Sequence, residues 1–264
     1  MLREVAPGVL VRQSAFCLSN AVIVLGDDGV LLIDPGISGA DLTDLASELH
    51  TRGLVVAAGF ATHPHWDHVL WHEAFGTAPR FASRTCVEHI HTDLEDARGK
   101  AGDLAPGAPL DLLGDLTPLP DGPRTLPWVG PRVHLVEHQA HAPGHVALLV
   151  EGAGVLVAGD MLSDVEIPLL DLDSPDPVAA YAEGLDRLSD LASTGARLVV
   201  PGHGAAGDAQ ELRRRLALDR DYLRALESGG GEDDPRLGPD TAYGRDWLLR
   251  DHGAQVAVGR RGHA

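Results

Sequence analysis

The residues His63-Pro64-His65-Trp66-Asp67-His68 place three imidazoles and a carboxylate within one short stretch. They directly follow the apolar run 54–61, which is typical of a buried strand. Alternate residues of an extended chain point to the same side, so His63, His65 and Asp67 can converge where the strand ends. His68 then falls where a new helix would begin. Imidazoles and carboxylates suit Zn²⁺ and related first-row metals, so this stretch predicts a metal site.

The composition describes a globular protein with an acidic surface. A length of 264 residues with 44% hydrophobic content is enough for one domain with a sizeable core. The formal net charge of −18 argues against nucleic acid or an anionic membrane as a partner, because both need clustered Lys and Arg. The first residues lack the apolar segment of a signal peptide, and Cys17 and Cys86 show no paired spacing, so we expect a cytoplasmic protein.

Strand-like segments occur in two clusters, with helical patterns between them. Residues 21–25 and 30–33 flank a hairpin turn, and Ser38 is placed to cap a helix. Later strands are expected at 133–137, 146–150, 155–158 and 197–200, and later helices at 68–75, 83–98, from Ser174, and at 208–226. Residues 99–131 are rich in Pro and Gly and fit either a loop over a site or short strands. Two strand clusters predict packed sheets with helical layers.

In three later segments, a His or Asp among small residues again lies beside a strand-like run. These segments are Ala142-Pro143-Gly144-His145, Ala158-Gly159-Asp160 and Pro201-Gly202-His203-Gly204. Small neighbours let the backbone approach a metal closely, and strand ends are where rigid scaffolds present functional groups. Each segment alone is a weak signal, since a turn with an incidental polar residue looks the same.

Taken in order with the opening stretch, these segments resemble the metallo-β-lactamase superfamily. That family shows His-x-His-x-Asp-His, then a single His, then an Asp after an apolar strand, then a last His. The resemblance covers residues 8–205 and includes Asp34 in Leu32-Ile33-Asp34-Pro35-Gly36. It implies an α/β fold, a four-layer αββα sandwich, with a dinuclear metal site along one edge of the sheets. Residues 1–227 would form this domain, with 228–264 as a C-terminal tail packed on it.

By position, the resemblance implies a role for eight residues. They are His63, His65 and His145 for the first metal, Asp67, His68 and His203 for the second, Asp160 as the bridge, and Asp34 as support of the metal loop. Asp67 would also be catalytic by orienting the nucleophile. The implied cofactors are two zinc ions, with iron or manganese as alternatives.

The implied activity is hydrolysis of a small thioester, lactone or ester by a metal-bridged hydroxide. Within the family, Cys at the position of Asp160 is associated with class B1 β-lactamases, whereas Asp is usual for glyoxalase II-type thioesterases, lactonases and phosphodiesterases. β-Lactamase activity is therefore expected to be weak at most. Two alternatives stay open: a mononuclear iron enzyme similar to persulfide dioxygenases, and a metal-binding protein without turnover. The expected partner is a small-molecule substrate, and a homo-oligomer is compatible with the sequence.

Four further residues are candidates for the substrate pocket. His72 follows His68 by one helical turn, and His141 precedes His145 by four residues in a role other than metal binding. Ile167 and Leu169 belong to the segment after Asp160 and would suit an apolar acyl group.

Overall fold

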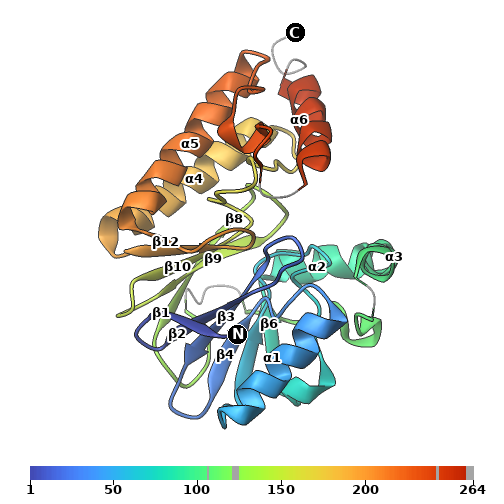
Figure 1. Cartoon of the computed structure of the whole chain (residues 1–264), viewed down its shortest axis with the longest axis vertical. Coiled ribbons are helices and arrows are strands. Elements are labelled where there is room, and N and C mark those ends of the chain that lie inside the picture. The colour runs from blue at the N-terminus through green and yellow to red at the C-terminus, as the bar shows by residue number, and fades with distance from the viewer. Residues whose placement is uncertain (106, 121–124, 242–243, 260–264) are drawn as a thin grey trace.

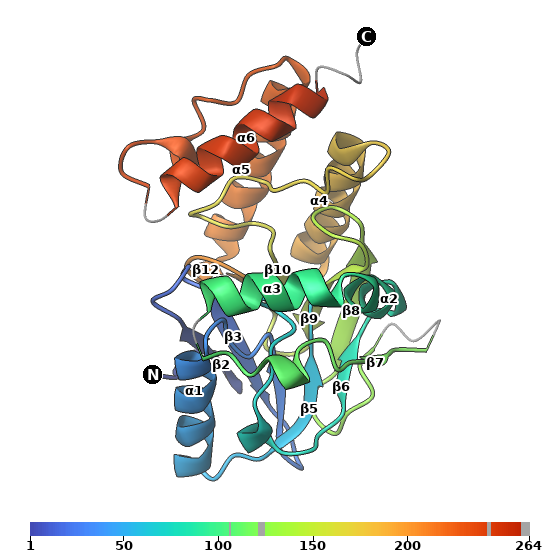
Figure 2. The same cartoon turned by 90° about the vertical axis from the view of Figure 1, so that its right-hand side faces the viewer.

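Two β-sheets lie face to face between helices in this computed structural model, which describes residues 1–105, 107–120, 125–241 and 244–259. Helices α1 to α3 cover the outer side of one sheet, and α4 and α5 cover the outer side of the other (Figures 1 and 2). The predicted αββα sandwich is confirmed.

The first sheet has seven strands in sequence order, antiparallel up to β4 and parallel from β4 to β7. The strands are β1 (Arg3–Ala6), β2 (Val9–Gln13), β3 (Asn20–Leu25), β4 (Val30–Ile33), β5 (Val56–Phe60), β6 (Arg80–Ala82) and β7 (Thr117–Pro118). The helices beside this sheet are α1 (Gly39–Thr51), α2 (Arg84–Thr92) and α3 (Leu94–Leu104), with short 3₁₀ helices η1 (Glu73–Phe75) and η2 (Leu110–Leu112).

The second sheet has five strands in the order β12-β11-β10-β9-β8, with one parallel pair, β10 and β11. The strands are β8 (Val133–His138), β9 (His145–Val150), β10 (Val155–Gly159), β11 (Leu198–Pro201) and β12 (Gly207–Asp208). The helices of this half are α4 (Pro177–Thr194), α5 (Ala209–Glu227) and α6 (Arg245–Gly259), with the 3₁₀ helix η3 (Pro235–Leu237).

Strand β9 shows why the inner strands are apolar throughout. Val146, Leu148 and Val150 belong to the core between the two sheets, whereas Ala147 and Leu149 face the core under α4 and α5. Because successive side chains of a strand point to opposite faces, a strand covered on both sides needs apolar residues at every position.

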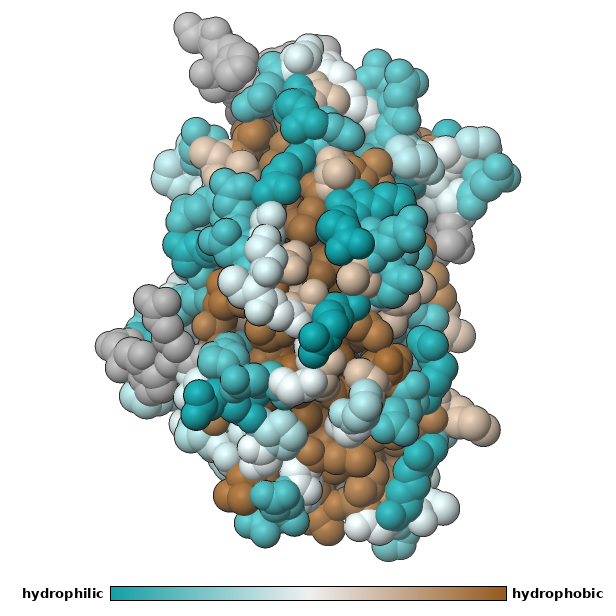
Figure 3. All heavy atoms as spheres, turned by 90° about the vertical axis from the view of Figure 1, so that its left-hand side faces the viewer, coloured by the Kyte–Doolittle hydropathy of each residue, from teal (hydrophilic) through white to brown (hydrophobic). Residues whose placement is uncertain are grey.

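The molecular surface is not uniformly polar. On the face shown in Figure 3, apolar residues are visible between the hydrophilic ones.

Three helix predictions need correction. The stretch 68–75 contains only η1, because Val69, Leu70 and Trp71 are all buried and adjacent residues of a helix cannot share one face. The stretch 83–98 is divided into α2 and α3 at Asp93. Helix α4 begins at Pro177 and is capped by Asp176, whose carboxylate accepts a hydrogen bond from the Ala179 N–H.

The Pro- and Gly-rich stretch 99–131 contains the end of α3, η2 and β7, and its residues 106 and 121–124 lie outside the described residues. In the C-terminal segment, η3 and α6 follow α5, and Leu248 of α6 is fully buried in the core of the second half. Residues 242–243 and 260–264 of this segment lie outside the described part. Within the described chain, no helix is both long and apolar enough to cross a membrane.

Candidate metal centre

A first group of potential ligands consists of His63, His65, His141 and Asp160, whose ligand atoms all lie within 4.8 Å of one another. His65 Nδ1 lies 3.1 Å from His63 Nε2 and 3.0 Å from His141 Nε2. Asp160 Oδ2 lies 3.4 Å from His63 Nε2. Bonds of 2.0–2.1 Å to a tetrahedral metal would separate the ligand atoms by about 3.3 Å, so these spacings fit a metal ion.

A second group consists of Asp67, His68 and His203. His203 Nε2 lies 3.3 Å from Asp67 Oδ2 and 3.4 Å from His68 Nε2, and His68 Nε2 lies 3.6 Å from the same Asp67 oxygen. His68 and His203 are buried, and Asp67 is only partly exposed. Segments separated by 135 residues therefore meet in one cluster of nitrogen and oxygen ligands.

Asp160 connects the two groups through its two carboxylate oxygens. Its Oδ1 lies 3.2 Å from His68 Nε2 in the second group, while its Oδ2 lies 3.4 Å from His63 Nε2 and 3.5 Å from His141 Nε2 in the first. A Cβ atom at residue 202 would lie 1.9 Å from Asp160 Oδ1, so only glycine fits there. Gly202 thus leaves room for the carboxylate between the two groups.

Asp34 lies behind the metal ligands and orients two of them. Its Oδ2 is 2.9 Å from His68 Nδ1 and accepts a 2.6 Å hydrogen bond from the Thr62 hydroxyl, which in turn lies 2.9 Å from His63 Nδ1. Because Nδ1 of His63 and of His68 is engaged in these contacts, the Nε2 atom of each ring is available to bind a metal. Asp34 holds this position with a φ of +47°, a strained conformation for a residue other than glycine.

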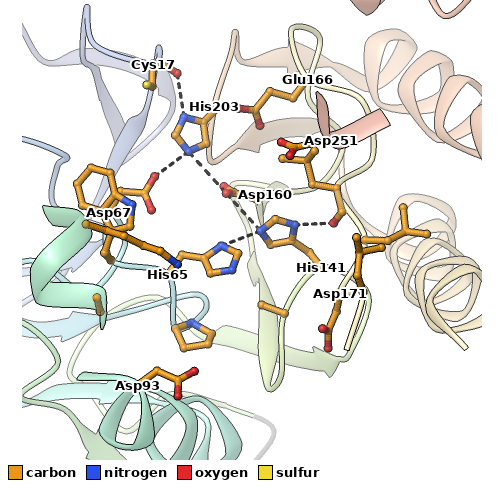
Figure 4. Close-up of a pocket in the computed structure, with 18 of the residues that line it drawn as sticks. Cys17, His65, Asp67, Asp93, His141, Asp160, Glu166, Asp171, His203 and Asp251 are labelled. Carbon is orange, nitrogen blue, oxygen red and sulfur yellow. Dashed lines mark hydrogen bonds and ion pairs between the residues drawn. The ribbon is translucent and has the colours of Figure 1, made fainter. Parts of the chain in front are cut away.

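Backbone carbonyls orient two further imidazoles, those of His141 and His203, in the same way. His141 Nδ1 lies 2.7 Å from the Leu169 carbonyl oxygen, and His203 Nδ1 lies 2.8 Å from the Cys17 carbonyl oxygen (Figure 4). The second carbonyl belongs to a turn in which Cys17 and Leu18 have φ values of +53° and +51°. This strained turn directs a carbonyl at the back of His203, which leaves its Nε2 for the metal.

The histidines of the first group are held in the neutral form that binds metals. Burial lowers the pKa of His63 and of His141 below the ordinary range. His65 is exposed at the cavity, and desolvation by the residues around its ring, followed in effect by neighbouring His141, lowers its pKa to about 3. These rings therefore present lone pairs rather than protons at neutral pH.

The second group lies in a field of carboxylates. Burial opposes a charge on His203, but Glu166, Asp160 and Asp67 outweigh it and raise the pKa of this imidazole to about 10. Burial likewise opposes a charge on His68, and Asp160 leads the carboxylates that raise its pKa well above the usual value. An environment that stabilises positive charge on imidazole also favours a divalent cation in the same place.

His145 was predicted to bind the first metal, and this prediction is wrong, because His141 occupies that place. His145 is the first residue of β9 and pairs with His138 of β8, so the strand ladder holds its ring behind the ligands. Its ring centroid lies 4.8 Å from that of His63, and a Cβ at Gly159 would lie 2.0 Å from its Nε2. His141 instead precedes the turn that leads into the strand, where a side chain can reach the site.

Both groups border a cavity of about 780 Å³. Leu169 lines this cavity, as the sequence interpretation expected of it, but His72 and Ile167 do not. His72 caps η1, with its Nδ1 accepting a hydrogen bond from the Ala74 N–H. Ile167 is 2% exposed and packs in the core under the helices, because the segment after Asp160 turns its apolar side chain inwards.

Glu166 and Cys17 also line the cavity, and neither had a role in the sequence interpretation. Glu166 is buried beside His203 (Figure 4), and burial together with Asp160 and Asp67 raises its pKa to about 7. Cys17 also lines the cavity, and burial raises the pKa of its thiol to about 12, which keeps it protonated. No pattern around either residue marks it in the sequence, because both reach the site through loop conformations.

The model of the family described as "Metallo-beta-lactamase superfamily" matches residues 15–203 of this chain. Among solved structures, a β-lactamase domain protein from Burkholderia ambifaria is 25% identical, with a TM-score of 0.66 over 86% of this chain and 78% of that one. A metallo-β-lactamase family protein from Thermus thermophilus is 24% identical, with a TM-score of 0.69 over 97% of this chain and 93% of that one.

A third similar structure is of the protein TTHA1623 in a di-iron-bound form. It is 27% identical, with a TM-score of 0.59 over 78% of this chain and 97% of that one. No curated protein matched the chain. These distant likenesses do not resolve a branch of the family, but the match to the family model spans most of the fold and all of the ligands named above. The chain belongs to the metallo-β-lactamase superfamily.

Proposed function

We propose that this protein is a dinuclear metallo-hydrolase that cleaves a small thioester, lactone or ester. The observation that carries the proposal is the pair of ligand groups joined by Asp160 beside a single cavity. The cavity volume of about 780 Å³ suits a small-molecule substrate. The completeness of the second group, Asp67, His68 and His203, favours this function over the mononuclear iron enzyme considered from the sequence.

Two bound divalent ions would supply a water molecule with a pKa near 7 and would polarise a carbonyl oxygen. Residues of this chain would position the metal ions and the attacking water. Asp67 borders the cavity and its carboxylate faces His203, so it is placed both to bind and to accept a hydrogen bond from the attacking water. Asp34, Leu169 and Cys17 keep the imidazoles from rotating. This arrangement needs no nucleophilic side chain.

We propose zinc as the metal, with iron or manganese as alternatives. The ligand set contains only imidazoles and carboxylates, which suit all three metals, and Cys17 offers its carbonyl oxygen to His203 rather than its sulfur to the site. The di-iron form of TTHA1623 shows that iron occupies a similar protein. Loading the metal-free protein with each metal in turn and comparing the rates identifies the metal that supports turnover.

Removing the metals is expected to abolish hydrolysis. We expect metal-replete protein to hydrolyse at least one member of a panel of esters, thioesters and lactones, and chelation to lower kcat/KM by about a thousandfold or more, because the attacking water then loses its activation. Readdition of the metal should restore the rate. Turnover that survives complete metal removal would contradict the proposal, and so would a fully loaded protein that turns over no member of the panel.

A further inference from the structure

Helix α6 forms one wall of the cavity, although it lies beyond residues 15–203, which match the family model. Trp247, Asp251 and Gln255 all line the cavity and are spaced four residues apart. Side chains at this spacing lie one above another on a single helix face. One face of α6 therefore presents an indole ring and a carboxylate to whatever occupies the cavity.

Gln255 fixes this face relative to the metal ligands. Its side-chain oxygen accepts a 2.6 Å hydrogen bond from the Leu170 N–H, and its amide donates a 2.8 Å bond to the Tyr222 hydroxyl of α5. The carbonyl of neighbouring Leu169 accepts the bond from His141 Nδ1. Gln255 is 3% exposed, so α6 is joined to the metal site through a short chain of buried hydrogen bonds.

The cavity is strongly acidic beyond the ligand groups. Figure 4 shows Asp93, Asp171 and Asp251 on different sides of it. The lining carboxylates outside the ligand groups, apart from Glu166, are Asp93, Asp96, Asp171, Asp173 and Asp251. Among the described lining residues, Lys100 is the one Lys or Arg, and its ammonium lies 2.8 Å from Asp96 in an ion pair. Low-dielectric walls focus such a field inside a cleft, so away from the two proposed metal ions these carboxylates oppose the entry of an anion.

Asp251 is the carboxylate that this face of α6 presents to the cavity. It is half-buried, and within the described part of the chain its carboxylate forms neither a hydrogen bond nor an ion pair. Burial raises its pKa, and Arg250 opposes this only in part. A cationic group beside Asp251 would supply the missing partner, and Trp247, one turn away, also lines the cavity and is of the residue type that attracts ammonium groups most strongly.

We propose that the face of α6 formed by Trp247 and Asp251 binds an ammonium group of the substrate, so that the enzyme prefers cationic substrates and rejects anionic ones. This inference rests on the proposed hydrolase function, because it places the scissile carbonyl at the ligand groups that border the same cavity. The substrate class is then a small ester or thioester with a quaternary or protonated amine.

Three thioesters of matched size test this preference: the acetyl thioester of thiocholine, its uncharged 3,3-dimethylbutyl isostere, and an analogue that ends in a carboxylate. We expect kcat/KM to be about tenfold higher for the cationic thioester than for the neutral one, and lowest for the anionic one. Added salt should reduce the difference. Asp251→Asn should lower the cationic-to-neutral ratio about fivefold, whereas Asp246→Asn, on an exposed position of α6 that does not line the cavity, should leave it unchanged.

A binding measurement separates this inference from the hydrolase function. Isothermal titration of metal-loaded protein with choline should show binding that is about fivefold weaker in Asp251→Asn, unchanged in Asp246→Asn, and absent for uncharged 3,3-dimethylbutanol. Equal rates for the three thioesters, or a preference for the anionic one, would overturn the inference while leaving the hydrolase intact. If no thioester is hydrolysed, the choline titration still decides, and equal affinity of wild type and Asp251→Asn would overturn the inference.

Discussion

His141→Ala is expected to reduce the metal content from about two ions per chain to about one and to lower kcat/KM by roughly a thousandfold. The imidazole of His141 faces His65 at 3.0 Å and Asp160 at 3.5 Å, so its loss leaves the first group without one of its three nitrogens. Loss of an outer partner of a metal ligand typically costs about 10–100-fold, and loss of the ligand itself should cost more. Metal analysis and steady-state kinetics on the same preparation measure both effects.

His145→Ala is the matched control for this variant. His145 is buried and lies four residues further along the chain, but its ring belongs to neither ligand group. We expect this variant to retain about two metals and to lose mainly stability, by about 2 kcal/mol, because a cavity replaces a buried ring. Thermal unfolding would show that loss. Retention of two metals by His141→Ala, together with loss of one by His145→Ala, would reverse the assignment.

Asp160→Asn is expected to have the second large effect, with a loss of metal from both groups and a fall in kcat/KM of about a thousandfold or more. Its two oxygens contact His68 in one group and His63 in the other, and burial is outweighed by His68, His203 and His63, which keep its pKa well below the ordinary value. The amide keeps the size of the side chain beside Gly202 but removes the charge that both metals would share.

Asp67→Asn provides the comparison for Asp160→Asn, because Asp67 contacts His68 and His203 in the second group alone. We expect this variant to keep about one metal per chain, bound by the first group. The role of Asp160 as a link between the groups would be refuted if its asparagine variant kept one metal at full affinity, as Asp67→Asn is expected to do. Titration with a chelator of known affinity distinguishes these outcomes.

Local patterns carried most of the fold, whereas the members of the second ligand group came from the resemblance to the family. The apolar strands were recognisable because strands covered on both faces need apolar residues throughout, as β9 has. Asp67 and His68 could be named because they belong to the stretch 63–68, which has the family's His-x-His-x-Asp-His pattern and lies shortly after β5. Ser38 was recognised as a cap, and its hydroxyl accepts the Asp41 N–H as that pattern predicts.

The choice between His141 and His145 could not be made from sequence, because both lie among small residues just before an apolar run. It depends on the residue at which β9 begins and on the contact of the His145 ring with Gly159, which join segments from different strands. Helix α6 was missed for a related reason. Its polar residues, among them Asp251 and Gln255, face a cavity rather than a core, so no apolar stripe marks the helix.

The number of metal ions per chain tests the dinuclear centre most directly. Protein loaded with zinc, freed of excess metal and analysed by inductively coupled plasma mass spectrometry should contain about two ions per chain. A value that stays at one or below after full loading would contradict the existence of two ligand groups acting together across Asp160.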